Sequence, residues 1–295
     1  MTIGVIIVTY NPDINLLEQT FFSIAEQVDE VLLVDNGSEN FDDINTKFSR
    51  LRNCTIASLH KNMGIAYATN VGFRYFIKKN FDYIVLSDQD SIFAKNYIKT
   101  FYEALSSVLL DNIAAFAPSI YDVISNQHRR FYYKRRIWIK QCYPDALYSV
   151  VFQAIASGLV IRVAYLRTIG CMNEDLFIDS VDFEWCWKLN FYDYKIIGCK
   201  NLVLQHTLGD RVRVIGHKKI NIHTNIRCYY ITRNTIYLSL HTRFLSVVDK
   251  FILFCKGCAY PWLFAVCSAK KFTTFKYCMR GLYDGVLGRL GYHTS

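Results

Sequence analysis

Apolar runs alternate with segments of helical spacing through the first third of the chain. The run 3–10 (IGVIIVTY) is rich in β-branched residues and stops at Asn11-Pro12, which is typical of a buried strand. Residues 16–24 then carry apolar side chains at helical spacing. Three further apolar runs end at polar turn clusters, namely 31–34, 54–59 and 83–86. This alternation predicts an α/β fold with a parallel, doubly wound sheet.

Polar residues stand at the carboxyl end of each predicted strand. In chain order these residues are Thr9 and Asn11, then Asp35, then Asn62, and finally Asp88. In an open α/β sheet the carboxyl ends of the strands meet at one edge, and ligands bind there. We therefore expect this edge to hold a binding site.

Asp88 and Asp90 flank a single residue directly after the fourth predicted strand. Two carboxylates this close repel each other unless a cation lies between them, and Mg²⁺ or Mn²⁺ binds a few carboxylates together with phosphate oxygens. Turns are rich in aspartate, so the triplet also fits an ordinary turn. A phosphatase with Asp88 as its nucleophile is a third interpretation, but that arrangement normally opens the chain on the first strand.

A second acidic cluster begins another segment of helical spacing and contains Asp179, Asp182 and Glu184. Asp179 and Asp182 suit helix capping, in which a carboxylate satisfies free backbone N–H groups. A carboxylate beside an aromatic wall such as Trp185 also suits a general base, because desolvation raises its proton affinity. His206 ends a later apolar run; one histidine there is more often structural, although imidazole with carboxylate and phosphate suits Mn²⁺ or Mg²⁺.

The charge is divided unevenly along the 295 residues. Residues 1–210 hold 20 basic and 23 acidic residues, whereas residues 211–295 hold 14 basic residues against Asp249 and Asp284 alone. The length and the hydrophobic content of 52% suit one large α/β domain with or without an appendage, and they exclude a disordered chain. We place a catalytic domain at 1–210 and a basic, aromatic-rich helical region at 211–295.

The basic region also holds the longest apolar stretch, residues 251–268. Lys256 and Pro261 interrupt it, so it suits a helix that lies on a membrane better than one that crosses it. The surrounding cationic and aromatic residues suit anionic headgroups, and a basic helix packed on its own core is the alternative. We expect no nucleic-acid partner, because the region has no zinc-finger spacing, RRM-type signature or basic-zipper heptad.

The N-terminus runs straight into the first predicted strand and lacks the basic segment and the cleavage site of a signal peptide. Without export, we expect the ten cysteines to be reduced thiols. Cys255 and Cys258 have CxxC spacing, but no second pair lies near them. We therefore expect them to fill apolar space rather than bind a metal.

The ordered motifs resemble those of a known family. Four successive motifs resemble those of family 2 glycosyltransferases with the GT-A fold: VTYNP at 8–12, LLVDNGS at 32–38, NMGIAYATNVG at 62–72 and LSDQDS at 86–91. Four later motifs resemble those of the bacterial rhamnosyltransferase branch: SGLVIR at 157–162, IGCMNEDLFIDSVDFEWCWK at 169–188, HTLGD at 206–210 and RCYYITRN at 227–234. The resemblance covers residues 3 to about 240. It implies a GT-A fold, which is Rossmann-like with a mostly parallel central sheet flanked by helices, followed by a helical, basic C-terminal extension.

The resemblance implies that the first strand ends bind a nucleotide sugar. Thr9, Asn11 and Asp35 are the positions that hold the nucleoside, and Asp35 accepts a hydrogen bond from the imide N–H of the base. Asn62 and Gly64 border the ribose and the diphosphate.

The resemblance also implies a divalent metal, Mg²⁺ or Mn²⁺. Asp88 contacts the ribose or a metal-bound water, and Asp90 binds the metal together with His206 and the diphosphate. Gln89 stands where many relatives have another acid, which removes one carboxylate from this set.

Asp182 matches the general base of the family, and Glu184 and Trp185 shape the acceptor or donor pocket. The implied reaction is a single displacement in which dTDP-β-L-rhamnose gives an α-L-rhamnoside. We expect a peripheral enzyme at the cytoplasmic face of the inner membrane that extends a polyprenyl-diphosphate-linked glycan for O-antigen or capsule. Alternatives are another nucleotide sugar, such as a galactofuranosyl donor, or a non-catalytic protein that binds a nucleotide sugar.

Overall fold

The structure is a computed structural model that describes residues 1–123, 126–136, 138–206, 211–215 and 218–293. At 206, 211–215 and 218–222 it describes the backbone alone. The domain boundary that we expected at residue 210 lies outside the described residues, and it remains a prediction.

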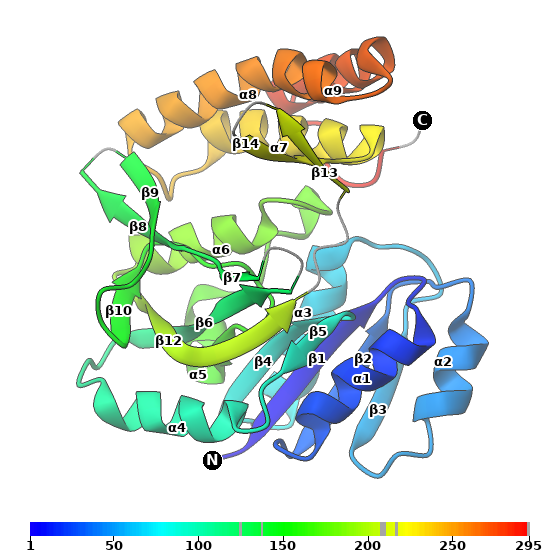
Figure 1. Cartoon of the computed structure of the whole chain (residues 1–295), viewed down its shortest axis with the longest axis vertical. Coiled ribbons are helices and arrows are strands. Elements are labelled where there is room, and N and C mark those ends of the chain that lie inside the picture. Colours follow the sequence, from blue (N-terminus) through cyan, green and yellow to red (C-terminus); the bar gives the residue numbers. More distant parts are fainter. Residues whose placement is uncertain (124–125, 137, 207–210, 216–217, 294–295) are drawn as a thin grey trace.

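The first half of the central sheet consists of the four predicted strands. They run parallel in the order β4-β1-β2-β3, with bounds β1 (Ile3–Thr9), β2 (Glu30–Asp35), β3 (Cys54–Ser58) and β4 (Tyr83–Asp88) (Figure 1). The apolar runs of β1, β2 and β4 are buried because helices cover both faces of the sheet, whereas β3 at its edge is half-buried.

The second half of the sheet continues outward from β4. It contains β11 (Val160–Arg162), β6 (Ile113–Asp122), β12 (Lys195–His206) and β10 (Tyr148–Val151). Strands β6 and β12 point the same way as β4, whereas β11 and β10 run against them. Two short strands pair at the margin: β5 (Ser91–Phe93) with β12 and β7 (Gln127–His128) with β6. The sheet is therefore mixed but mostly parallel, as the sequence predicted.

Helices pack on both faces of this sheet. One face carries α1 (Ile14–Ala25), α2 (Phe41–Phe48) and α4 (Tyr97–Ser107), and the other carries α3 (Ile65–Lys78), α5 (Val163–Ile169) and α6 (Val181–Phe191). Strand β1 shows how one strand serves both cores: Val5 and Ile7 point to the first face, and Ile6 and Val8 point to the second.

Three helices form the C-terminal region, which lies above the sheet in Figure 1. They are α7 (Asn225–His241), α8 (Val247–Cys267) and α9 (Lys271–Val286), and they pack on one another. Thr224 and Ser246 cap α7 and α8 by accepting bonds from backbone N–H groups of the first turns. Helix α8 runs on without a break through Lys256 and Pro261, the two residues that interrupt the apolar stretch in the sequence.

Smaller elements connect the sheet to these helices. A 3₁₀ turn, η1 (Glu174–Leu176), precedes α6. Two hairpins consist of β8 (Phe131–Arg135) with β9 (Trp138–Cys142), and of β13 (Arg211–Ile215) with β14 (Lys218–Ile222). Lys134 on β8 forms a salt bridge with Asp249 on α8, so the β8–β9 hairpin lies against the start of that helix (Figure 1).

Candidate active site

The strand ends predicted to bind a ligand lie side by side. In the β1–β2 pair Thr9 lies opposite Asp35, and in the β1–β4 pair Val8 lies opposite Asp88. The parallel register thus brings residues 9, 35 and 88, which are far apart in the sequence, to one edge of the sheet.

Asp35 is buried and holds the turn that follows β2. The Thr9 hydroxyl donates to Asp35 Oδ1 over 3.2 Å, and the backbone N–H groups of Gly37 and Ser38 donate to Asp35 Oδ2 over 3.1 and 3.2 Å. A carboxylate has about four lone-pair sites, so these bonds leave capacity for a ligand donor. The predicted contact with a nucleoside base therefore remains compatible with the turn.

Asn11 and Asn62 shape the loops beside Asp35. Asn11, with a φ of 46°, accepts from the N–H of Glu39 over 2.7 Å and thereby ties the loop after β1 to the loop after β2. Asn62 Oδ1 accepts from the Asn36 amide and from the N–H of Gly64, each over 3.0 Å. These bonds fix the entry into α3, where we predict the ribose and the diphosphate.

Gly64 has a φ of 86°, and a Cβ there would lie 2.5 Å from Phe177 Cδ2 and 2.6 Å from the Phe177 carbonyl oxygen. Only glycine tolerates both this positive φ and this close approach of Phe177. This contact joins the predicted nucleotide side of the site to the segment that precedes α6.

The residues of the Asp-Gln-Asp triplet at 88–90 bond to different parts of the structure. The Ser157 hydroxyl donates to the Asp88 carboxylate, which connects β4 to the segment before β11. Gln89 Oε1 instead accepts from the backbone N–H of Tyr10 over 2.8 Å. The middle residue therefore fastens the loop after β1, and its amide oxygen is directed at this loop rather than at a metal position beside Asp90.

The predicted metal ligands Asp90 and His206 come together at the level of the backbone. Strand β5 begins at Ser91, directly after Asp90, and Ser91 pairs with His206 of β12. The side chain of His206 lies outside the described residues. Within the part of the chain that the structure describes, three or more His, Cys, Asp or Glu side chains nowhere gather as a metal site. A carboxylate and an imidazole, completed by diphosphate oxygens, nevertheless form a donor set that suits Mg²⁺ or Mn²⁺.

Asp182 lies in the first turn of α6 and is half-buried. Its pKa is raised to about 7, mainly by burial and also by the nearby Asp179 carboxylate, against the opposing effect of backbone N–H groups of Phe183 and Ala156. Ala156 precedes Ser157, the residue that donates to Asp88, so this short segment connects Asp182 to the strand edge. A carboxylate with this pKa in a half-buried residue suits a general base at neutral pH.

Glu184 and Trp185 lie on the inner side of α6. Trp185 is 0% exposed, and its indole N–H donates to the carbonyl of Gly170 over 3.2 Å. Burial raises the pKa of Glu184 to about 7, while Lys188 lowers it. The structure thus shows both residues supporting α6 from its core side, and their predicted role in a substrate pocket remains a prediction.

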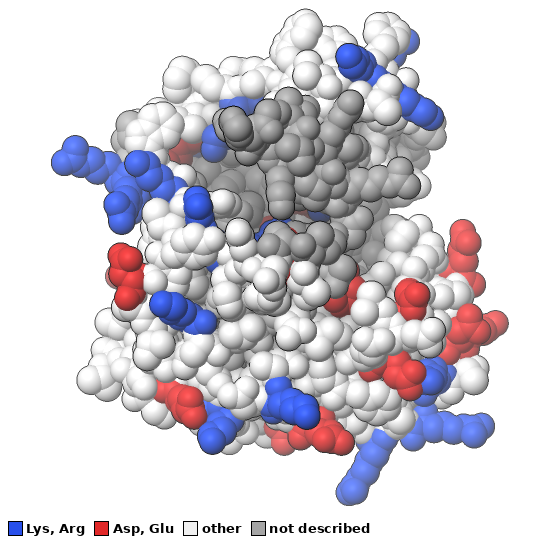
Figure 2. All heavy atoms as spheres, in the orientation of Figure 1, with Lys and Arg blue, Asp and Glu red and all other residues white. Residues whose placement is uncertain are grey.

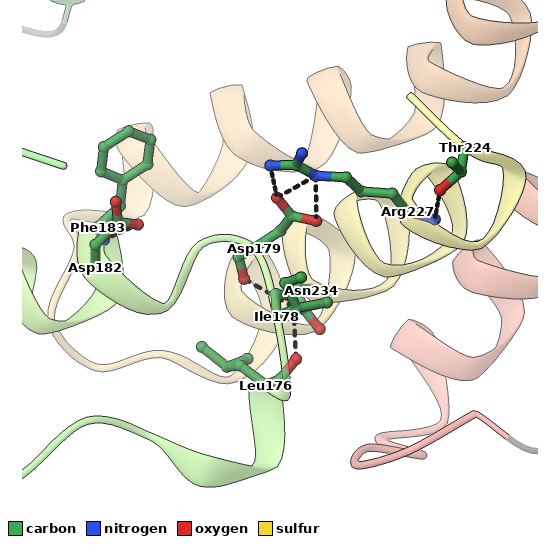
Figure 3. Close-up of polar contacts among 8 residues, drawn as sticks. All are labelled: Leu176, Ile178, Asp179, Asp182, Phe183, Thr224, Arg227 and Asn234. Carbon is green, nitrogen blue, oxygen red and sulfur yellow. Dashed lines mark hydrogen bonds and ion pairs between the residues drawn. The ribbon is translucent and has the colours of Figure 1, made fainter. Parts of the chain in front are cut away.

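The segment between η1 and α6 has an uncommon backbone. Phe177, Asp179 and Ser180 each have a φ of 64°. The cap residue of α6 is Ser180, whose side chain makes no capping bond, so Asp179 does not cap the helix. Asp179 instead accepts from Arg227 of α7 over 3.2 Å, as Figure 3 shows.

Sequence reasoning assigned no role to the residue that contacts this segment most extensively. The side-chain amide of Asn234 on α7 donates to the carbonyls of Leu176, Ile178 and Asp179 over 2.9, 2.7 and 2.9 Å (Figure 3). The available signal was the motif at 227–234, whose polar residues recur at the spacing of one helix face.

Comparisons with known proteins identify the family of the chain. The family model described as "Glycosyl transferase family 2" matches residues 4–170. The chain is 30% identical over 243 residues to the dTDP-rhamnosyl transferase RfbF of Shigella flexneri, a match that covers 79% of this chain and 78% of that protein.

Solved structures share the fold at low sequence identity. A crystal structure of S. aureus TarS 1–349 superposes with a TM-score of 0.57 at 14% identity, covering 98% of this chain and 82% of that one. GalNAc-T7 with UDP, GalNAc and Mn²⁺ gives a TM-score of 0.57 at 13% identity, covering 87% of this chain and 55% of that one. These likenesses confirm the GT-A fold. Together with the family model and the RfbF match, they show that the chain belongs to glycosyl transferase family 2.

Proposed function

We propose that this glycosyltransferase is an inverting, metal-dependent rhamnosyltransferase that uses dTDP-β-L-rhamnose. The observation that carries the reaction type is Asp182, a half-buried residue whose carboxyl pKa is raised to about 7 and which is linked through Ala156 and Ser157 to the strand edge. The choice of donor is supported by the dTDP-rhamnosyl transferase that is 30% identical over 79% of the chain.

In the proposed reaction Asp182 takes the proton from an acceptor hydroxyl while that oxygen attacks the anomeric carbon of the donor. The bond from this carbon to the diphosphate breaks, and dTDP leaves. One displacement inverts the anomeric centre, so the β-linked donor gives an α-L-rhamnoside. Asp35, Asn62 and Asp88 hold the nucleotide along the edge of the sheet while Asp182 lies across from it.

Asp90 and His206 are the residues proposed to hold Mg²⁺ or Mn²⁺. When bound, the divalent ion stabilises the negative charge that develops on the departing diphosphate. The crystal structure of GalNAc-T7, which shares the fold, contains Mn²⁺ and UDP. Gln89 contributes no carboxylate, so we propose that the diphosphate oxygens supply much of the coordination.

The proposed acceptor is a glycan linked to polyprenyl diphosphate, as in O-antigen or capsule assembly, and the proposed location is the cytoplasmic face of the inner membrane. Large apolar side chains on α8 face solvent: Phe251 is 66% and Trp262 is 68% exposed. Among the described residues, α8 is also the one helix whose length and composition suit a membrane span. An acceptor with a lipid anchor explains why an enzyme would keep such a surface.

The β8–β9 hairpin extends this membrane surface. Its exposed residues include Arg135, Arg136 and Lys140, and Trp138 between them is 54% exposed. Figure 2 shows Lys and Arg side chains gathered where the hairpin projects, whereas Asp and Glu are mixed with them over the lower part of the molecule. Aromatic and cationic side chains at one edge suit the headgroup region of an anionic bilayer.

A panel of nucleotide sugars tests the proposed donor. The full-length protein is incubated with each nucleotide sugar, a lipid-diphosphate glycan acceptor and Mg²⁺ or Mn²⁺, and the release of nucleoside diphosphate is measured. We expect the highest kcat/KM with dTDP-β-L-rhamnose. A higher kcat/KM with a UDP-hexose or a galactofuranosyl nucleotide would overturn the choice of donor while leaving the family assignment intact.

A further inference from the structure

The motif RCYYITRN at 227–234 has no role in the reaction described so far. Its residues Arg227, Tyr230, Arg233 and Asn234 lie on α7 at intervals of three, three and one, so they share one face of the helix. All four contact the segment 175–180 that leads into the turn carrying Asp182. We call this face of α7 the template, because its four residues hold that segment in place.

The segment needs such a template because its backbone is unfavourable. Phe177, Asp179 and Ser180 adopt positive φ values, which residues with a side chain occupy only when their surroundings impose them. Strained backbone of this kind concentrates at functional sites. Here it determines where α6 begins and therefore where Asp182 points.

Asn234 supplies the central contacts. It is fully buried, and its amide donates to three successive parts of the segment, the carbonyls of Leu176, Ile178 and Asp179. Its own oxygen accepts from Arg233 Nε over 2.9 Å. The orientation of the amide is thus fixed from both ends, as a residue that positions another segment requires.

Arg233 and Tyr230 complete the template. Arg233 is buried, and its Nη2 donates to the Leu176 carbonyl over 2.9 Å while its Nη1 donates to the Gly291 carbonyl over 2.6 Å. The Tyr230 ring stacks on the Phe177 ring at a centroid distance of 5.1 Å. Phe177 in turn occupies the space beside Gly64 at the start of α3, so the template also bears on the predicted nucleotide side of the site.

We propose that Asn234 and Arg233 are positioning residues for the catalytic base: they hold the segment 176–180 in its strained form and thereby fix the location and the burial of Asp182. This inference rests on the proposed role of Asp182 as general base. It assigns to the first helix of the C-terminal region a function in the chemical step.

Loss of the template should change the titration of Asp182 as well as its location. Among the side chains that the structure describes, the titratable groups that face Asp182 are Asp179 on the approach to α6, Cys186 one turn along α6, and Tyr132 on β8, none of them a cation. Burial is the largest cause of the rise in the pKa of Asp182. A relaxed segment admits water and lets that pKa fall towards its ordinary value.

The experiment compares Asn234→Ala and Asn234→Asp with Thr274→Val in the full chain. Thr274 is a suitable control because it is buried on α9 and its hydroxyl lies within hydrogen-bond distance of Asn225, Ser268 and Lys270. Thr274→Val therefore removes a comparable set of bonds from the same helical region and leaves the contacts of the segment 176–180 in place. Measured quantities are kcat per folded molecule, KM for the donor, the pH profile of kcat/KM and amide hydrogen exchange of residues 176–184.

We expect kcat of Asn234→Ala to fall about 100-fold with little change in the KM for the donor, because a small misplacement of a catalytic group has that effect. The acidic limb of its pH profile moves down by about one pH unit or more, and exchange in 176–184 speeds up. Asn234→Asp falls further, because an acceptor replaces the donor opposite three carbonyls. Thr274→Val changes the melting temperature but neither the pH profile nor kcat per folded molecule.

Asp182→Asn, measured in the same assay, distinguishes failure of the proposed base from failure of the positioning role. If Asp182→Asn retains turnover, the proposed base is wrong and the positioning role falls with it. If Asp182→Asn is inactive while Asn234→Ala keeps the wild-type pH profile and kcat per folded molecule, the positioning role alone is overturned. Should Asn234 variants fold poorly, Arg233→Lys gives the same test, because it keeps the charge but removes the fork of donors that bonds the carbonyls of Leu176 and Gly291.

Discussion

At the scale of single residues, the site depends on carboxylates whose surroundings differ. Asp35 is buried and accepts bonds from Thr9 and from two backbone N–H groups. Asp182 also accepts bonds from backbone N–H groups, yet burial raises its pKa to about 7. The first is suited to hold a ligand and the second to exchange a proton.

The pH dependence of transfer follows from the pKa of Asp182. A general base works in its ionised form, so kcat/KM should rise with pH through about 7 and level off above it. Initial rates measured from about pH 5 to 9 test this. A limb near the ordinary pKa of aspartate, about 4, would show that the base is not a buried carboxylate of this kind.

The same pKa makes a prediction about stability. The folded protein binds the proton of Asp182 more tightly than the unfolded chain does, and this preference stabilises the fold at low pH. The stabilisation is lost as the pH rises from about 4 to about 7 and Asp182 ionises. Asp182→Asn has no such group, so at pH 8 it should be more stable than the wild type by on the order of 2–4 kcal/mol. Chemical denaturation at pH 8 and near pH 4 measures this difference, which should vanish at the lower pH. A less stable variant at pH 8 would contradict the assignment.

Gly64 provides a test of the packing beside the site. Gly64→Ala should destabilise the protein and weaken nucleotide binding, because its Cβ meets Phe177 at 2.5 Å and its φ of 86° is unfavourable for alanine. Gly288→Ala is the matched control, since Gly288 also has a positive φ, 66°, but its Cβ would meet its nearest neighbour only at 3.9 Å. We expect Gly64→Ala to cost at least about 1–2 kcal/mol more than the control. Equal losses in thermal melts and equal dTDP affinities would refute the predicted contact.

At the scale of elements, the sequence predicted best those parts that local patterns specify. The strands observed at 3–9, 30–35, 54–58 and 83–88 were predicted from the apolar runs at 3–10, 31–34, 54–59 and 83–86, and the polar ends of these runs then predicted the edge. The register that places Thr9 opposite Asp35 follows from the parallel order of the strands. Local pattern was sufficient because buried strands depend mainly on their own residues.

Elements that depend on distant contacts escaped prediction. The positive φ values at 177, 179 and 180 are imposed by Asn234 and its neighbours, which lie more than fifty residues further along the chain. The sequence did not show that α8 continues through Pro261 as one helix. The exposed basic hairpin at 131–142 was not foreseen either, because its charges belong to the near-neutral part of the sequence.

This hairpin makes a prediction about membrane binding. The double variant Arg135→Glu and Arg136→Glu should bind less to vesicles of anionic lipid, because each basic residue near such a surface contributes about 1 kcal/mol. Arg50→Glu with Arg52→Glu is the control: the change of charge is the same, and these exposed residues lie beyond α2. Co-sedimentation at low and high salt measures both. Equal loss in the two variants would indicate a general charge effect and no hairpin contact.

At the scale of the whole molecule, the proposed active site and the proposed membrane-binding surface lie in different parts of the protein. The strand edge and Asp182 lie in the half built on the sheet, and α8 and the hairpin present exposed apolar and basic groups. Helix α7 lies between them, since it packs on α8 and α9 and also bonds the segment before α6. A lipid-linked acceptor would reach Asp182 while its anchor stays in the bilayer.

Metal removal tests the proposed cofactor. Chelation of divalent ions should abolish transfer, and Mg²⁺ or Mn²⁺ should restore it. Independently of activity, His206→Ala should weaken Mn²⁺ binding in the presence of dTDP, because it removes one proposed ligand, whereas His60→Ala, an exposed histidine after β3, should not. Calorimetric titration with Mn²⁺ measures this. Unchanged Mn²⁺ affinity in His206→Ala would remove that residue from the proposed metal site.

The central claim is that Asp182 acts as the base of an inverting glycosyl transfer. Its most direct test is Asp182→Asn, measured for sugar transfer and, in parallel, for affinity to dTDP-rhamnose. Since a general base contributes about 10²–10⁴-fold, we predict a loss of turnover of that size with donor affinity unchanged. Turnover close to that of the wild type, with the donor still bound, would contradict the account.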